Sequence, residues 1–194
     1  MPDDDIKTAF ERAWEKAQRI DAPDAQMKEL QYGPEGARLA ARFLKEDGFD
    51  LSQALAAHPA AVRKFVERGV VSTLISNITL PRIQRQRRDG DRAIEGLMAL
   101  KRDKSRFASF RDKLEALFTY YERARKETYN SLRQEYDAAL RQAMRQQTGV
   151  NTQMRVDVES NPEFRQRWQE VSGRLDREAE ERLARLMGEL DTIS

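Results

Sequence analysis

Apolar side chains recur every three or four residues along most of the chain, which is the spacing of helices with one buried face. The clearest stripe begins at Phe107 and alternates steps of three and four as far as Thr128, as in a heptad pattern. Beyond this point, the stripe continues in steps of four through Leu132, Tyr136, Leu140 and Met144. This drift predicts one long, nearly straight helix that ends near Gly149.

A second stripe runs from Phe164 and Trp168 to Ile193 at helical spacing. Residues 161–163 (Asn-Pro-Glu) precede it and are typical of a helix start, with an N-cap residue, proline at the first position and an acid in the first turn. Two stripes joined by a short connection bury each other only if the helices run antiparallel. The sequence therefore predicts a long antiparallel helical hairpin over residues 105–194.

Shorter helices are expected to form a bundle over residues 1–104. The first is predicted at residues 6–20, where apolar side chains share one helical face. Tyr32-Gly33-Pro34 is expected to separate a short turn near Met27 from a second helix, because proline is tolerated best in a first turn. Gly48 follows the expected end of that second helix.

Three further segments complete the expected bundle. Asp50 is expected to cap a short helix. Residues 62–78 carry apolar side chains at helical intervals, and although the β-branched stretch 70–75 also fits a strand, the longer spacing favours a helix. An arginine-rich polar run to Asp91 is then expected to connect to a helix that reaches Leu100.

Composition agrees with an all-α protein that carries an extended arm. Charged residues make up 35% of the 194 and hydrophobic residues 39%, and the mean hydropathy is -0.82. That is polar for a globule of this size, which should bury roughly 70% of its unfolded surface. Because each helix of a two-helix arm buries only one stripe, a coiled-coil-like hairpin beside a small helical bundle accounts for this polarity.

The chain has the features of a cytoplasmic protein. It contains no cysteine, which excludes disulfides and cysteine metal sites and fits a reducing compartment. The acidic first five residues lack the apolar core of a secretory signal. No run approaches the roughly 20 apolar residues that span a bilayer, so we expect no membrane partner.

No set of residues predicts catalysis. The single histidine, His58, precedes a proline at a helix junction, where a loop or packing role is more common than a ligand role. The acidic pairs at residues 180–181 and 89–91 fit solvated faces or a loop, and the Glu-x-x-His di-metal motif is absent. Residues 33–36 lack the spacing and the lysine of a phosphate loop. We therefore expect no enzyme, metal, cofactor or small-molecule substrate.

The middle of the chain is basic. Residues 61–150 carry 20 basic and 11 acidic side chains, whereas both flanking parts are net acidic. Five arginines lie close together in sequence: Arg82, Arg85, Arg87, Arg88 and Arg92. They could neutralise phosphates in a salt-sensitive manner, but Asp89 and Asp91 interrupt them and no aromatic residues interleave to stack on bases. A solvated loop, or pairing with the acidic N-terminal third, explains them equally well.

The tip of the hairpin is the candidate protein-binding surface. Phe164 and Trp168 are expected to pack in the helical seam against Leu140 and Met144. A sharper interpretation makes the tip a partner surface formed by Tyr136, Leu140, Met154 and Val156. We therefore expect a non-enzymatic scaffold or adaptor that binds another protein, or a second copy in a four-helix bundle. Nucleic-acid binding through residues 82–92 is the alternative.

Three segments resemble an uncharacterised family of bacterial helical proteins. They are residues 6–16 (IKTAFERAWEK), 32–44 (YGPEGARLAARFL) and 77–82 (NITLPR). None is a motif of known chemistry, so the resemblance implies no activity, ligand or functional residue. It implies a bacterial cytoplasmic origin.

Overall fold

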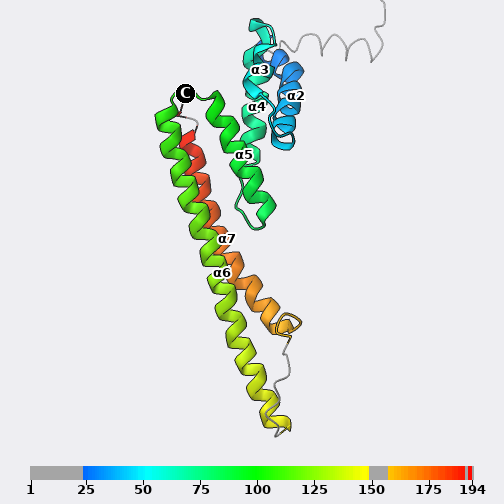
Figure 1. The fold of residues 1–194 in the computed structure, drawn as a ribbon, viewed down its shortest axis with the longest axis vertical. Helices are drawn as coiled ribbons and strands as arrows, with labels where there is room; N and C mark the ends of the chain where they lie inside the picture. The colour runs from blue at the N-terminus through cyan, green and yellow to red at the C-terminus, as the bar shows by residue number, and fades with distance from the viewer. Residues whose placement is uncertain (1–23, 149–156, 191, 194) are drawn as a thin grey trace, which may run out of the picture. The chain divides into compact units, whose positions relative to one another are not determined.

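The computed structural model describes residues 24–148, 157–190, 192 and 193, and most of these residues are helical. These residues form six α-helices and no strand, which confirms the all-α prediction (Figure 1). The chain divides into two compact units, residues 1–75 and 76–194. The boundary expected near residue 104 lies within the second unit, and the helix expected at 6–20 lies outside the described residues.

The first unit contains α2 (Asp24–Lys45), α3 (Leu51–Ala56) and α4 (Ala60–Ser76). Asp50 caps α3 as predicted, since its Oδ1 accepts a hydrogen bond from the Gln53 amide at 2.8 Å. Helix α4 continues through the β-branched stretch, which confirms the helical interpretation of that segment. The apolar core of the unit consists of Ala40, Phe43, Leu51, Leu55, Phe65, Val66, Val70 and Leu74.

Proline 34 lies inside α2, so the break expected before it is wrong. A proline crowds the residue before it, but Gly33 has no Cβ to clash with the ring. The helix is also held tightly against α4. A Cβ added to Gly36 would lie 2.0 Å from the Val66 carbonyl oxygen, and one added to Gly69 would lie 2.2 Å from the Gly33 carbonyl oxygen. Packing against α4 therefore keeps α2 continuous despite its missing hydrogen bond.

The second unit contains α5 (Gln84–Leu100) and the two long helices α6 (Lys104–Thr148) and α7 (Pro162–Leu190). Helices α6 and α7 run side by side in opposite directions, which confirms the predicted hairpin (Figure 1). Near one end Lys113 Nζ lies 2.6 Å from Glu189 Oε2. Near the other, the Tyr129 hydroxyl donates to Glu159 at 2.7 Å.

Both ends of α7 are capped by polar groups. Asn161 Oδ1 accepts hydrogen bonds from the amides of Glu163 and Phe164 at 2.8 and 3.1 Å, as the Asn-Pro-Glu sequence predicts. At the other end, Lys101 Nζ donates to the carbonyls of Leu190 and Ile193. A cation at a helix C-terminus also interacts favourably with the helix dipole. Lys101, at the α5–α6 junction, thus connects this junction to the C-terminal end of α7 through hydrogen bonds.

Two apolar clusters hold the hairpin together. The larger contains the first half of the α6 stripe, which is buried: Phe107, Phe110, Leu114, Leu117, Phe118 and Tyr121. At the tip, Leu132, Val158 and Phe164 form a second cluster, with Tyr129, Tyr136, Leu140 and Trp168 packed against it. Phe164 and Trp168 therefore lie in the seam near Leu140, as expected. In the described part of the chain, no helix has the length and apolar character needed to cross a bilayer.

Candidate functional site

The arginine-rich run begins a helix, so the expectation of a polar connection as far as Asp91 is wrong. Arg85 pairs with Asp89 at 3.4 Å, and Arg87 pairs with Asp91 at 3.2 Å. Pairs of opposite charge four residues apart stabilise a helix, and arginine is itself a good helix former. The two aspartates that interrupt the basic run in sequence thus favour a helix in this segment.

The N-cap residue of α5 exposes an apolar side chain. Ile83 occupies the N-cap position in an extended conformation and provides no side-chain hydrogen bond to the helix. The Gln86 side chain compensates in part for the missing N-cap hydrogen bond. Its Oε1 accepts hydrogen bonds from the amides of Arg82 and Ile83 at 3.0 and 3.2 Å. The Ile83 side chain remains 60% exposed.

Arg82 connects the segment before α5 to α7. Its Nε lies 3.0 Å from Asp176 Oδ2, and its Nη2 lies 2.5 Å from Glu180 Oε1. Burial disfavours the charge on Arg82, but its hydrogen bonds to Asp176 and Glu180 outweigh burial and raise its pKa. These carboxylates belong to the hairpin, so the expected pairing with the acidic N-terminal third is wrong for Arg82.

Arg87 connects α5 to α6. Its Nη2 donates to Glu115, and its Cζ lies 5.4 Å from the centroid of the Phe118 ring. Nη1 is buried and has no hydrogen-bond partner among the described residues; Glu122 Oε2 lies 4.0 Å away. Burial opposes the charge on Arg87, but the neighbouring carboxylates, Glu115 first, raise its pKa. The N–H groups of this buried nitrogen therefore have no acceptor among the described residues.

Asp176 is the centre of a hydrogen-bond network within the hairpin. Its Oδ1 accepts from the Tyr121 hydroxyl at 2.7 Å and from Arg125 Nη1 at 3.0 Å, while Oδ2 faces Arg82. Arg125 Nη1 also donates to the Tyr121 oxygen at 3.2 Å. The network connects the segment before α5 to both long helices.

Two hairpin tyrosines are expected to ionise at higher pH than an ordinary tyrosine. Burial, followed by the hydrogen bond to Asp176, raises the pKa of Tyr121; the hydrogen bond to Glu159 raises the pKa of Tyr129. Because the folded state holds both protons more tightly than the unfolded state, their contribution to stability is complete below about pH 10 and is lost as pH rises further. Titration of tyrosinate absorbance should show a late-ionising fraction, and Tyr121→Phe should reduce it. Identical titration curves for the folded and urea-unfolded chain would contradict this expectation.

A pocket of about 550 Å³ lies between the start of α5 and the hairpin. Four cationic side chains line it: Arg82, Arg87, Arg125 and Lys126. The apolar and aromatic part of its wall consists of Pro81, Ile83, Tyr129 and Trp168, and Gln84 and Glu122 complete the lining. Ligand-binding clefts are commonly about 300–1,000 Å³ in volume and combine an apolar wall with a few polar groups.

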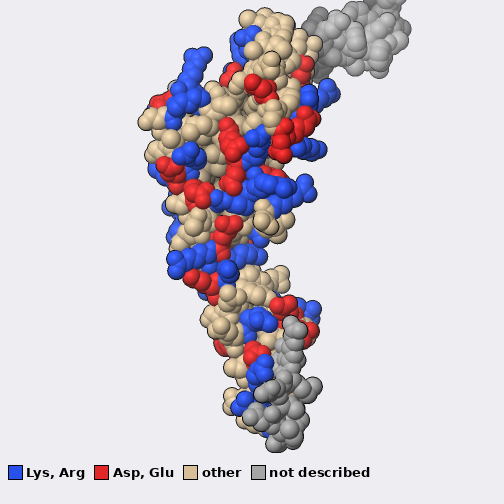
Figure 2. Space-filling model, viewed as in Figure 1, with Lys and Arg blue, Asp and Glu red and all other residues tan. Residues whose placement is uncertain are grey.

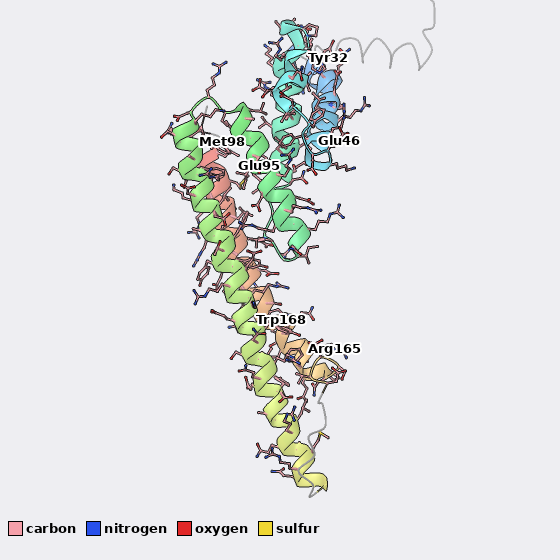
Figure 3. The ribbon with its side chains drawn as sticks, in the orientation of Figure 1. Tyr32, Glu46, Glu95, Met98, Arg165 and Trp168 are labelled. Atoms are coloured by element: carbon pink, nitrogen blue, oxygen red, sulfur yellow. The ribbon has the colours of Figure 1, made fainter. Side chains whose placement is uncertain are left out.

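The aromatic wall is held in place by ring contacts. Trp168 meets Tyr129 edge to face, with the ring centroids 5.1 Å apart. On the same indole, Arg125 Cζ lies 5.3 Å from the ring centroid, within range of a cation–π interaction. Figure 3 shows Trp168 on the part of α7 that runs beside α6. The indole is therefore positioned from two sides and remains half-buried at the pocket.

The five arginines singled out from the sequence do not form one surface. Arg82 and Arg87 line the pocket. Arg85 and Arg88 are exposed, and Arg92 lies 2.9 Å from Glu95 on the same helix. Figure 2 shows acidic and basic side chains interspersed on the face that it presents. This mixing lowers the local positive charge available to a polyanion.

The other residues predicted to form sites lie elsewhere. Tyr136 and Leu140 are half-buried against the tip cluster, and Met154 and Val156 lie outside the described residues. His58 Nδ1 lies 3.8 Å from Glu35 Oε1 at the α3–α4 junction. Over the described ranges, no three histidine, cysteine, aspartate or glutamate side chains are grouped as metal ligands.

Of the residues that line the pocket, only Arg82 and Arg87 were named from the sequence as candidate site residues, and the role of the others was not predicted, among them Ile83, Lys126, Tyr129 and Trp168. One signal was available for Ile83, because it is an apolar residue flanked by arginine and glutamine at a helix start. Tyr129 lies outside the apolar stripe identified in α6, and Trp168 was interpreted as a residue of the helical seam. The position of both at the pocket depends on the register of α6 against α7, which periodicity does not define.

Comparisons with curated proteins and with solved structures find no match. A family model, described as a family of unknown function, matches residues 52–192. This range contains the segment 77–82 that resembles an uncharacterised family, while segments 6–16 and 32–44 precede it. Since the match covers most of the chain, including α5 and both helices of the hairpin, this protein belongs to the family of unknown function DUF6657.

Proposed function

We propose that this chain is a non-enzymatic scaffold of the bacterial cytoplasm, which binds another protein through the pocket between α5 and the hairpin. The observation that carries the proposal is the composition of that pocket. Tryptophan, tyrosine and arginine are the residues most enriched at the energetic centres of protein interfaces, and all three line it. The exposed Ile83 adds an apolar contact at the same place.

The surroundings of the pocket also support a binding role. The guanidinium groups of Arg82 and Arg125 are held by Asp176, and the Trp168 ring is held by Tyr129 and Arg125. Side chains fixed before binding lose less conformational entropy when a partner arrives. The pocket is therefore preorganised to receive a partner.

Nucleic-acid binding is the alternative, and the ion pairs weigh against it. Arg82 and Arg87 each contact at least two carboxylates. A phosphate backbone would have to compete with those carboxylates, and it gains most from cations that release mobile counterions. Arg85 and Arg88 are exposed, but these two side chains alone offer few phosphate contacts.

A photo-crosslinking amino acid at position 83 tests the proposal in the native host. Position 83 lies at the pocket, and position 106, exposed in the first turn of α6, is the matched control. We expect a discrete protein adduct from position 83 that survives nuclease treatment and is absent from position 106. An adduct of twice the mass of the chain would identify the partner as a second copy.

Two outcomes would contradict the proposal. If light produced no adduct from position 83, or the same adducts from both positions, the pocket would not be a protein-binding site. If the adduct disappeared after nuclease treatment, nucleic acid would be the ligand. Mass spectrometry of the crosslinked peptide distinguishes these cases.

A further inference from the structure

We propose that the pocket binds an acidic segment of the partner, in which a carboxylate lies next to a large apolar side chain. This inference rests on the proposed function and specifies the chemistry of the partner. It is carried by the exposed Lys126 ammonium and the buried Nη1 of Arg87, neither of which has a hydrogen-bond acceptor among the described residues, beside an exposed apolar wall.

Lys126 and Arg87 supply the donors. Lys126 lies at the pocket on an exposed position of α6, and no carboxylate of the described chain is within ion-pair distance of its Nζ. Arg87 Nη1 is buried without a hydrogen-bond partner in the same part of the chain. A buried donor left unsatisfied destabilises the folded state. A carboxylate that enters the pocket would be an acceptor for the Lys126 ammonium and would lie beside the Arg87 guanidinium, which lines the same pocket.

Ile83 and Trp168 supply the apolar contact. Ile83 is 60% exposed at the N-cap of α5, and Trp168 is half-buried on α7. An apolar side chain inserted here covers surface of both residues. Large apolar anchors seated on aromatic surfaces commonly contribute much of the energy of an interface. The partner therefore needs an apolar residue close to its acidic one.

The carboxylates around the pocket select against a polyanion. Glu122 lines the pocket, and Asp176 and Glu180 lie behind Arg82. They offset much of the charge of the guanidinium groups, so the pocket provides binding energy for one negative charge rather than for many. This balance favours a peptide carboxylate over a nucleic-acid backbone.

Short random peptides displayed on phage and selected against the full chain test the proposal. Selected sequences should carry glutamate or aspartate beside a large apolar residue. A synthetic peptide of the selected sequence should bind Lys126→Glu about tenfold more weakly than the unmodified chain, because one charge-assisted contact is lost. Arg106→Glu changes the same charge at another exposed position of α6 and should bind normally.

A charge exchange makes the test specific. The same peptide with lysine in place of its acidic residue should recover affinity for Lys126→Glu. Selection of neutral or basic peptides, selection of none, or equal binding to both charge variants would overturn the proposal. So would tighter binding by a single-stranded oligonucleotide or a phosphoserine version of the peptide.

The two experiments fail in different ways. A nuclease-resistant adduct from position 83 together with neutral selected peptides would leave the proposed function intact and refute the acidic segment. Loss of the adduct would refute protein binding itself.

Discussion

Replacing Gly36 with alanine is expected to destabilise the first unit by about 1–3 kcal/mol, the usual cost of overpacking a close contact. The new Cβ would lie 2.0 Å from the carbonyl oxygen of Val66 and 2.8 Å from the Val70 amide nitrogen. Both are backbone atoms, so no side-chain rotation relieves the clash. Alanine gains up to about 1 kcal/mol over glycine in a helix interior, which is too little to compensate. Gly69→Ala, in α4, should also destabilise the first unit, because its Cβ would lie 2.2 Å from the carbonyl oxygen of Gly33.

Hydrogen exchange followed by mass spectrometry is the appropriate measurement, because it reports stability region by region. Amides of α2 and α4 should exchange faster in Gly36→Ala, while those of α6 and α7 should not. Gly188→Ala in α7 is the matched control, since a Cβ there has no heavy atom within 4 Å. That control should be neutral or stabilising. Unchanged exchange in α2 and α4 would contradict the close helix contact.

Replacing Phe164 with alanine is expected to cost about 3–5 kcal/mol and to open the tip of the hairpin. Phe164 is only 2% exposed. Its ring centroid lies 5.8 Å from that of Tyr129 and 5.6 Å from that of Tyr136, in edge-to-face contacts. Truncation removes the apolar contact and leaves a cavity between α6 and the first turn of α7.

The effect should be local. Hydrogen exchange should accelerate in residues 129–140 and 157–168, and residues 107–118, which pack in the larger cluster, should keep their protection. Phe164→Leu retains most of the apolar volume and should show a smaller change of the same kind. If exchange accelerated uniformly along the hairpin, the two clusters would belong to one cooperative element.

The hairpin was predictable because its signals are local and repeated. The α6 stripe and the α7 stripe each extend over several turns, and the Asn-Pro-Glu start of α7 appears in the structure as the Asn161 cap. The alternation of apolar and polar positions defines which face of each helix is buried. Antiparallel packing then follows from the short connection.

Two features depended on distant partners and could not be predicted in this way. Pro34 indicates a helix boundary in sequence, and only the contact of Gly36 and Gly69 with neighbouring backbone explains why α2 continues. The pocket combines residues 81–87, 122–129 and Trp168. Their proximity depends on how α7 is aligned along α6, which no local pattern encodes.

The network around Asp176 has a mechanical consequence. Its carboxylate receives hydrogen bonds from Tyr121 and Arg125 of α6 and from Arg82 before α5. A displacement of α7 by one helical turn, about 5.4 Å, would break all three contacts at once. Sliding of α7 along α6 is therefore strongly disfavoured, and we do not expect this hairpin to transmit a conformational change in that way. A segment bound in the pocket would act instead on the residues before α5, whose Arg82 belongs to the network.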